Sequence, residues 1–196
     1  MTIGTAEQYR DRLKAMKPNV YIGGRQIARD DPLLAPAVNV ISFTFEAAQE
    51  LQFQDLVATK SHLTGESINR FTNVHRSVDD LMKKLEMTRM LCQRVGGCIQ
   101  RCMANDTLNA MGVVSKEIDE AKGTEYHPRF LKYLEYYQKN DLVGNAAQTD
   151  VKGDRSKRPH EQADLDLYLR IVERKKDGIV VRGAKAHNSI GPYADE

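Results

Sequence analysis

The chain has 196 residues, 41% hydrophobic and 29% charged, and its 29 basic and 27 acidic residues are interspersed, so it lacks the basic stripe that binds a nucleic-acid backbone. No apolar run approaches the roughly 20 residues that cross a bilayer, and the polar, amphipathic N-terminus lacks the pattern of a secretory signal. We therefore expect a cytoplasmic globular protein without nucleic-acid or membrane partners, whose three cysteines stay reduced.

The first predicted elements are a helix, a small hairpin and a group of short helices. The helix begins with a capping box at Thr5 and ends before Pro18. The stretch Val20–Ile27 alternates around two glycines, a pattern typical of a β-hairpin. The span from Pro32 to Ala58 predicts helix in pieces, because prolines punctuate it.

The strongest helical pattern begins at Ser77 and continues towards Lys122. Gly96-Gly97 lies in its middle, where it would kink the helix or allow another group to approach the backbone closely. A further helix is predicted from about Pro128 to Lys139. The side of the long helix that we expect to be buried is marked by Leu81, Leu85, Cys92 and Val95.

After Asn140 the sequence becomes polar and then rich in β-forming residues. Two predicted strands, Leu167–Val172 and Ile179–Val181, flank a turn at Asp177-Gly178. The prediction is a mainly α chain with a C-terminal β segment: a helical domain at 1–142, then a loop and the first strands of an incomplete β-domain at 143–196. Two strands cannot bury a face by themselves, so we expect this chain to be a fragment of a longer protein.

Two of the three cysteines, Cys98 and Cys102, are four residues apart. On the expected helix they would lie about 40° apart and could reach one point, whereas Cys92 would point about 120° away. Packing in the core is favoured by spacing alone, because free cysteines are usually buried. A redox pair usually has the C-x-x-C spacing, and a metal site would need two further ligands, so both stay open as alternatives.

The polar stretch Gln148–Arg155 carries a second signal. Its side chains offer hydrogen-bond donors and acceptors, and Lys152 and Arg155 can meet phosphate. Gly153 is expected to allow a backbone turn that a side chain would block. Because the stretch is neither a Rossmann fingerprint nor a P-loop, its composition alone favours a solvated connection between two domains.

Five stretches together resemble one family of flavoproteins. They are GESINRF, VGGCIQRC, QTDVKGDR, EQADLDLYLRIVE and KKDGIVVRGAKAH. They resemble the 4-hydroxyphenylacetate 3-hydroxylase family, and the C-x-x-x-C spacing resembles its 4-hydroxybutyryl-CoA dehydratase branch, over essentially the whole chain. The resemblance implies an acyl-CoA dehydrogenase-like fold, of which this chain would hold the N-terminal helical domain and the start of the middle β-domain.

The resemblance also implies two cofactor sites. Cys98 and Cys102 would bind an oxygen-sensitive [4Fe–4S] cluster, completed by a histidine and a cysteine from later in the chain. Ser189 stands where the family commonly has threonine, which keeps the hydroxyl but removes the methyl group that restricts its rotamer. The residues expected to line FAD are Gln148, Thr149, Asp150, Val151, Lys152, Gly153, Asp154, Arg155, His187 and Ser189.

The activity implied by the resemblance is dehydration of 4-hydroxybutyryl-CoA to crotonyl-CoA, with isomerisation of vinylacetyl-CoA. The implied mechanism is radical: a base removes the acidic hydrogen beside the thioester, the flavin takes an electron, and the cluster assists the departing hydroxyl as a Lewis acid. The implied partners are an acyl-CoA substrate and the other subunits of a homotetramer. The catalytic residues are expected beyond Glu196, so the chain alone is expected to be inactive.

Two alternatives stay open. A two-component flavin-dependent aromatic monooxygenase of the same family would bind reduced FAD and need no iron. A non-catalytic helical fragment would have thiols that only pack in its core. Iron and sulfide content distinguishes the dehydratase from both alternatives, and flavin binding distinguishes the two alternatives from each other.

Overall fold

The predicted N-terminal helix forms in the computed structural model, which describes residues 3–196, as α1 (Ala6–Ala15). The Thr5 hydroxyl accepts a hydrogen bond from the Gln8 backbone N–H, and the Gln8 side chain accepts one from the Thr5 N–H. These two bonds satisfy N–H groups that have no partner within the helix. The predicted capping box is therefore confirmed.

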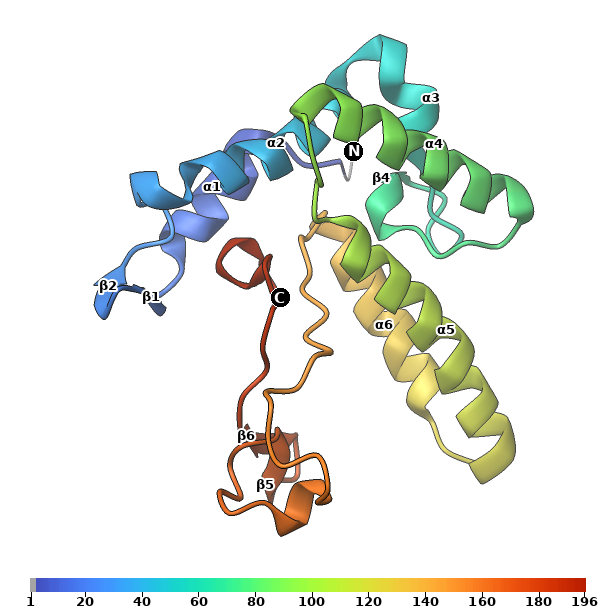
Figure 1. Cartoon of the computed structure of the whole chain (residues 1–196). Coiled ribbons are helices and arrows are strands. Elements are labelled where there is room, and N and C mark those ends of the chain that lie inside the picture. Colours follow the sequence, from blue (N-terminus) through green and yellow to red (C-terminus); the bar gives the residue numbers. More distant parts are fainter. Residues whose placement is uncertain (1–2) are drawn as a thin grey trace. The chain divides into compact units, whose positions relative to one another are not determined.

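The described residues divide into two compact units. Unit 1 extends as far as Asn145 and also includes Pro192–Glu196, whereas unit 2 is Ala146–Gly191. All six α-helices of the described residues and two of the three small sheets belong to unit 1 (Figure 1). None of the helices in residues 3–196 has the length and apolar character that spanning a membrane requires.

The last residues of the chain complete unit 1. The Tyr9 hydroxyl donates to the Tyr193 carbonyl oxygen at 2.8 Å, and the Arg12 guanidinium donates to the Asp195 carboxylate at 2.8 Å. The Asn145 N–H donates to the Glu196 carbonyl oxygen at 2.8 Å. Helix α1 and residues 192–196 are therefore bound to each other within one unit.

The first half of unit 1 holds short helices and short hairpins. The predicted hairpin is confirmed as β1 (Val20–Ile22) and β2 (Arg25–Ile27), with both turn glycines in the left-handed region. The helix in pieces is confirmed as α2 (Ala35–Gln49) and α3 (Gln54–Val57), with single 3₁₀ turns before each. A second hairpin, formed by β3 and β4, was not predicted, so β structure also occurs before residue 142. It pairs β3 (Ala58–Lys60) with β4 (Ser67–Asn69).

The long helix expected from Ser77 to Lys122 is in fact two helices. Helix α4 (Val78–Val95) ends at Gly96, whose φ of +73° is the left-handed conformation of a helix C-cap. Helix α5 (Cys102–Lys122) starts six residues later. The prediction that Cys98 and Cys102 lie one turn apart on one helix is therefore wrong, because the glycine pair ends the helix instead of kinking it.

The buried side of α4 also differs from the prediction. Leu81 and Leu85 were expected in the core, but they are 44% and 51% exposed. The face that packs against α2 and α3 contains Met87 and Leu91. Lys84 is also buried and pairs with Asp106 of α5. Cys92 and Val95 are half-buried beside this cluster, so the prediction holds only at the C-terminal end of the helix.

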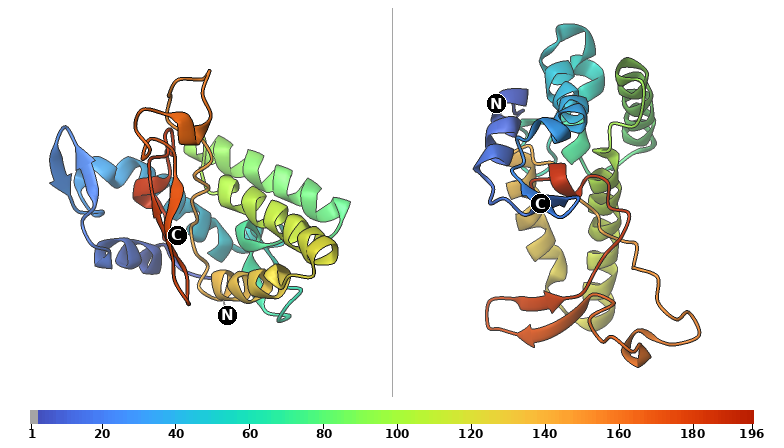
Figure 2. Two further views of the ribbon diagram at one scale, coloured as in Figure 1. Left: turned by 90° about the horizontal axis from the view of Figure 1, so that it is seen from below. Right: turned by 60° about the vertical axis from the view of Figure 1, so that its left-hand side comes forward.

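Helices α5 and α6 (Tyr126–Lys139) lie side by side in an antiparallel pair (Figures 1 and 2). Helix α6 begins two residues before the predicted Pro128, because the Asp119 carboxylate of α5 accepts hydrogen bonds from the first two backbone N–H groups of α6. The core between the two helices contains Ala104, Leu108, Phe130, Leu134 and Tyr137, together with Leu142.

Unit 2 contains one hairpin and an extended polar connection. Strand β5 (Arg170–Arg174) pairs with β6 (Ile179–Arg182), so the first strand begins three residues later than predicted. Before the strand, Tyr168 forms an isolated parallel bridge with Ala184. The two chain segments come so close there that only Gly183, with a φ of +136°, fits between them.

Replacing Ser77 by alanine is expected to lower the free energy of unfolding of unit 1 by about 1 kcal/mol. The Ser77 hydroxyl accepts a hydrogen bond from the Asp80 N–H and caps α4. Urea unfolding should show a lower midpoint with an unchanged slope. An unchanged midpoint would mean that the Asp80 carboxylate, which accepts from the Arg76 N–H, is a sufficient cap by itself.

Candidate functional site

Two of the three cysteines lie in and directly after the loop 96–101 between α4 and α5, Cys98 in the loop and Cys102 at the start of α5. The side chains of Ile99 and Arg101 are fully buried, whereas Cys98 is exposed and Cys102 is half-buried. Burial therefore alternates along the loop, with buried residues between and beside the thiols. Because both buried side chains hold the backbone in place, the loop fixes where the two thiols emerge.

The Arg101 guanidinium is the main anchor of this loop. It forms an ion pair with the Asp141 carboxylate and donates to the Thr44 hydroxyl at 3.2 Å and to the Leu142 carbonyl oxygen at 3.1 Å. It also lies over the Phe45 ring, 4.3 Å from its centroid. Arginine suits such a site because its planar fork can donate several hydrogen bonds at once while stacking on an aromatic ring.

Gln100 lies between the two cysteines in an unusual conformation. Its φ is +59°, which is uncommon for a residue with a side chain, and its N–H points towards the Cys98 sulfur at 3.4 Å. Its side-chain oxygen Oε1 is buried and has no hydrogen-bond partner among the described residues. Neither Arg101 nor Gln100 was predicted as a site residue, although the quoted VGGCIQRC stretch contains both.

Cys102 is half-buried and lies near two charged side chains, Asp106 and Lys84. Burial raises the pKa of Cys102, and the neighbouring Cys98 and Asp106 raise it further, whereas Lys84 acts in the opposite direction. The Lys84 ammonium donates to the Asp106 carboxylate at 2.7 Å, one helical turn after Cys102.

The thiols fit part of an iron–sulfur site. Cys98 and Cys102 are free, and thiolates are the usual protein ligands of a [4Fe–4S] cluster. No group of three or more potential metal ligands is present in residues 3–196. The described part of the chain thus supplies a pair of sulfur donors, which could hold two corners of a cluster.

In unit 2 the two predicted flavin-lining segments lie side by side. The Ala186 N–H donates to the Thr149 carbonyl oxygen at 2.9 Å, and the Lys185 ammonium donates to the Asp150 carboxylate at 2.6 Å. These contacts bring Gln148–Asp150 next to His187, which lies 37 or more positions later in the sequence. His187 has a φ of +58°, so the backbone turns sharply at the point where the resemblance implies a flavin contact.

The prediction for Gly153 is confirmed in part: a side chain would be blocked there, but the residue does not lie in a turn. Its φ lies outside the left-handed region, but a Cβ atom there would lie 2.6 Å from both the Gln162 oxygen and the Leu167 side chain. The buried Gln162 side chain accepts from the Asp154 N–H at 3.0 Å and donates to the Asp154 carbonyl oxygen at 2.8 Å. Gln162 was not predicted as a site residue, yet it holds this loop together.

The cationic side chains of the loop are free to meet an anion. Lys152 and Arg155 are exposed and form no hydrogen bond or ion pair with the rest of the described chain. Hydrogen bonds from Ser156 lower the pKa of Asp154, so this carboxylate is ionised and already has partners. Exposed cations without partners in the described chain fit the diphosphate of a dinucleotide.

The remaining predicted flavin residues, Val151 and Ser189, have no described side-chain contact with the other predicted flavin residues. Val151 is half-buried, and Ser189 is exposed directly before the buried Ile190. The structure thus brings the segment Gln148–Asp150 next to the segment that ends at His187. No described contact links the side chain of Ser189 to the polar loop.

The family described as "4-hydroxyphenylacetate 3-hydroxylase N terminal" matches residues 5–196. A curated relative, the 4-hydroxybutyryl-CoA dehydratase/vinylacetyl-CoA-Δ-isomerase of Clostridium aminobutyricum, is 49% identical over 187 residues. The match covers 94% of this chain and 38% of the relative, so the chain spans well under half of that protein's length. The resemblance inferred from the sequence is confirmed.

Solved structures agree with these similarities. An oxygen-tolerant archaeal 4-hydroxybutyryl-CoA dehydratase from N. maritimus matches 95% of this chain and 37% of its own, with a TM-score of 0.89 and 39% identity. The oxygenase component of 4-hydroxyphenylacetate 3-monooxygenase, in complex with FAD and 4-hydroxyphenylacetate, matches 93% of this chain and 38% of its own. With a TM-score of 0.78 and 18% identity, the second likeness concerns the fold alone.

Proposed function

Because the chain belongs to the 4-hydroxyphenylacetate 3-hydroxylase family, matching its N-terminal region, we propose that it is part of a 4-hydroxybutyryl-CoA dehydratase that also isomerises vinylacetyl-CoA. The observation that carries this proposal is the pair of free thiols beside the buried side chains of Ile99 and Arg101, with Cys98 exposed and Cys102 half-buried. A core-packing role alone does not account for an exposed Cys98.

The proposed enzyme uses FAD and a [4Fe–4S] cluster. Cys98 and Cys102 would hold the cluster, and Gln148–Arg155 with His187 and Ser189 would contact the flavin. When bound, these groups supply a Lewis acid for the departing hydroxyl and an electron acceptor for a radical reaction. A relative crystallised with FAD supports the flavin, and the paired thiols support the cluster.

This chain's own residues would position the cofactors without performing the proton transfers. Lys152 and Arg155 would neutralise the diphosphate of the flavin, and the Asp150–Lys185 contact would keep the two flavin-lining segments in register. Arg101 and Ile99 would hold the thiols at their separation. The base that removes the hydrogen beside the thioester lies outside the residues described.

We further propose that unit 2 is the start of the middle β-domain of an acyl-CoA dehydrogenase-like fold. In its hairpin the side chains of Ile171, Ile179 and Val181 are 43%, 55% and 48% exposed. A two-stranded hairpin needs further strands or a helix to bury such an apolar face. The working form is proposed to be a cytoplasmic homotetramer that takes an acyl-CoA substrate. Sedimentation of the protein in its natural length tests the assembly.

The test of the proposed function is the iron and acid-labile sulfide content of the protein, purified without oxygen in its natural length. About four iron and four sulfide per chain are expected, and Cys98→Ser and Cys102→Ser should each lose most of both. Cys92→Ser is the matched control, because Cys92 packs beside the core of α4 and should leave the iron content unchanged.

Two other results would contradict the dehydratase. Bound FAD without iron would assign the protein to the oxygen-using members of the family, and the thiols would then only pack. Iron that is retained in both Cys98→Ser and Cys102→Ser would place the cluster elsewhere. Loss of iron in Cys92→Ser as well would show that the loss reflects general damage to the helix.

A further inference from the structure

Unit 1 contains a pocket of about 760 Å³ that is lined by neither the cysteine loop nor the polar loop. It is bounded by α5, α6, the connection between β3 and β4, and residues 74–76 before α4. Its volume suits a small organic ligand. The floor is apolar and is formed by Leu63, Val74, Phe130, Leu131 and Leu134.

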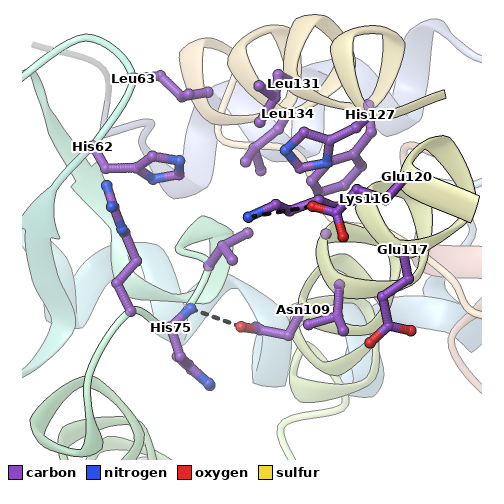
Figure 3. A pocket seen from close by; sticks show the side chains of 15 residues that line it. His62, Leu63, His75, Asn109, Lys116, Glu117, Glu120, His127, Leu131 and Leu134 are labelled. Carbon is purple, nitrogen blue, oxygen red and sulfur yellow. Dashed lines mark hydrogen bonds and ion pairs between the residues drawn. The ribbon is translucent and has the colours of Figure 1, made fainter. Parts of the chain in front are cut away.

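Polar side chains from three elements converge over this floor. Figure 3 shows His62, Lys116 and His127 pointing towards one space, from the β3–β4 connection, α5 and α6 respectively. Arg76 also lines the pocket. Burial and the nearby Arg76 charge lower the pKa of His62, which favours its neutral, hydrogen-bonding form.

Two carboxylates, those of Glu117 and Glu120, also line the pocket. The Glu117 carboxylate points away from the shared space in Figure 3. Glu120 pairs with Lys116 at 4.0 Å, but both side chains are mostly exposed, and such an ion pair contributes little. A ligand phosphate can therefore replace Glu120 as the partner of Lys116.

Helix α5 connects this pocket to the cysteines. Cys102 is its first residue and Lys116 lies fourteen residues later, about 21 Å along the axis. The helical repeat places Asn109 and Lys116 within about 40° of Cys102, so all three lie on one face of the helix. The His75 N–H donates to the Asn109 side chain at 2.6 Å, midway between them.

We propose that this pocket binds the nucleotide end of the acyl-CoA substrate. The adenine would lie on the apolar floor beside Phe130 and His127, and the phosphates would meet Lys116 and Arg76. The pantetheine arm, which separates the phosphates from the thioester, would run along α5 and bring the acyl group towards Cys102. This inference rests on the proposed function, because a coenzyme A ester carries its phosphates at one end of the pantetheine arm and the reacting acyl group at the other.

The test is calorimetric binding of coenzyme A and of pantetheine to the protein in its natural length. Lys116→Gln is expected to weaken coenzyme A binding about fivefold, and the double variant with Arg76→Gln roughly 25-fold. Pantetheine lacks the phosphates, so its binding should be the same in all of these proteins. Lys122→Gln is the matched control, since Lys122 is exposed at the end of α5 outside the pocket.

The result that overturns the proposal is coenzyme A binding that is equally tight in the original protein and the double variant. If iron is present at the same time, the dehydratase proposal stands and only the pocket assignment fails. Failure of the original protein to bind coenzyme A also overturns the pocket assignment. Equal weakening of coenzyme A and pantetheine would do so too, because it would report damage to the fold and not a phosphate site.

Discussion

Arg101→Ala is expected to lower the free energy of unfolding of unit 1 by about 3–5 kcal/mol, because it leaves the Asp141 carboxylate buried without its partner. Both side chains of this ion pair are only 1% exposed. The substitution also removes the hydrogen bonds to Thr44 and Leu142. Few single substitutions in a domain of this size have so large an effect.

Chemical unfolding of unit 1 checks this prediction, with Arg10→Ala as the control. Arg10 forms an ion pair with Glu46, but both side chains are about half exposed, so its loss should cost less than 1 kcal/mol. Adding Asp141→Asn to Arg101→Ala should recover part of the loss, because it removes the uncompensated charge. A loss for Arg101→Ala no larger than that for Arg10→Ala would contradict the anchor role.

Gly183→Ala is expected to destabilise unit 2 by roughly 3 kcal/mol or more, enough to unfold its hairpin. A Cβ atom at this position would lie 2.4 Å from the Tyr168 carbonyl oxygen and 2.5 Å from the Leu169 Cα. Both are backbone atoms, so no side chain can move aside to accommodate the methyl group. The φ of +136° is also strained for any residue other than glycine.

Amide hydrogen exchange within residues 146–191 measures this effect without requiring unit 1 to unfold. Protection of the β5–β6 amides should be lost in Gly183→Ala. Gly178→Ala is the control, because Gly178 lies in the turn of the same hairpin with no atom within 4 Å of its added Cβ. Protection that is equally strong in both variants would show that the segments can separate at little cost.

Elements specified by local chemistry could be predicted from the sequence. The capping box at Thr5 and the two glycines of the β1–β2 turn act on neighbouring backbone groups, so a few residues determine each structure. The start of α6 could not be placed in the same way. It depends on the Asp119 carboxylate, which belongs to another helix.

The buried side of α4 shows why periodicity alone was insufficient. Leu81 and Leu85 give as good a helical stripe as Met87 and Leu91, and the contacts with α2 and α3 decide which stripe is covered. The glycine pair after Val95 was noticed, but its effect depends on whether the backbone adopts the left-handed cap. Spacing does not determine that choice.

The candidate site could be predicted as a set of residues but not as an arrangement. The motifs identified Cys98 and Cys102 and the polar loop, whereas the buried Arg101 that anchors the thiols acts through Asp141, forty positions away. The pairing of Asp150 with Lys185 is likewise a long-range contact. Such contacts form only in the folded chain, so no local sequence pattern predicts them.

The return of residues 192–196 to unit 1 imposes an order on folding. During synthesis α1 leaves the ribosome before its partners, because Tyr193 and Asp195, which bind Tyr9 and Arg12, are made about 180 residues later. Contacts this distant in sequence slow folding, because a long loop must close before they form. The part of α1 that binds residues 192–196 therefore stays uncovered until almost the whole of this sequence has been translated.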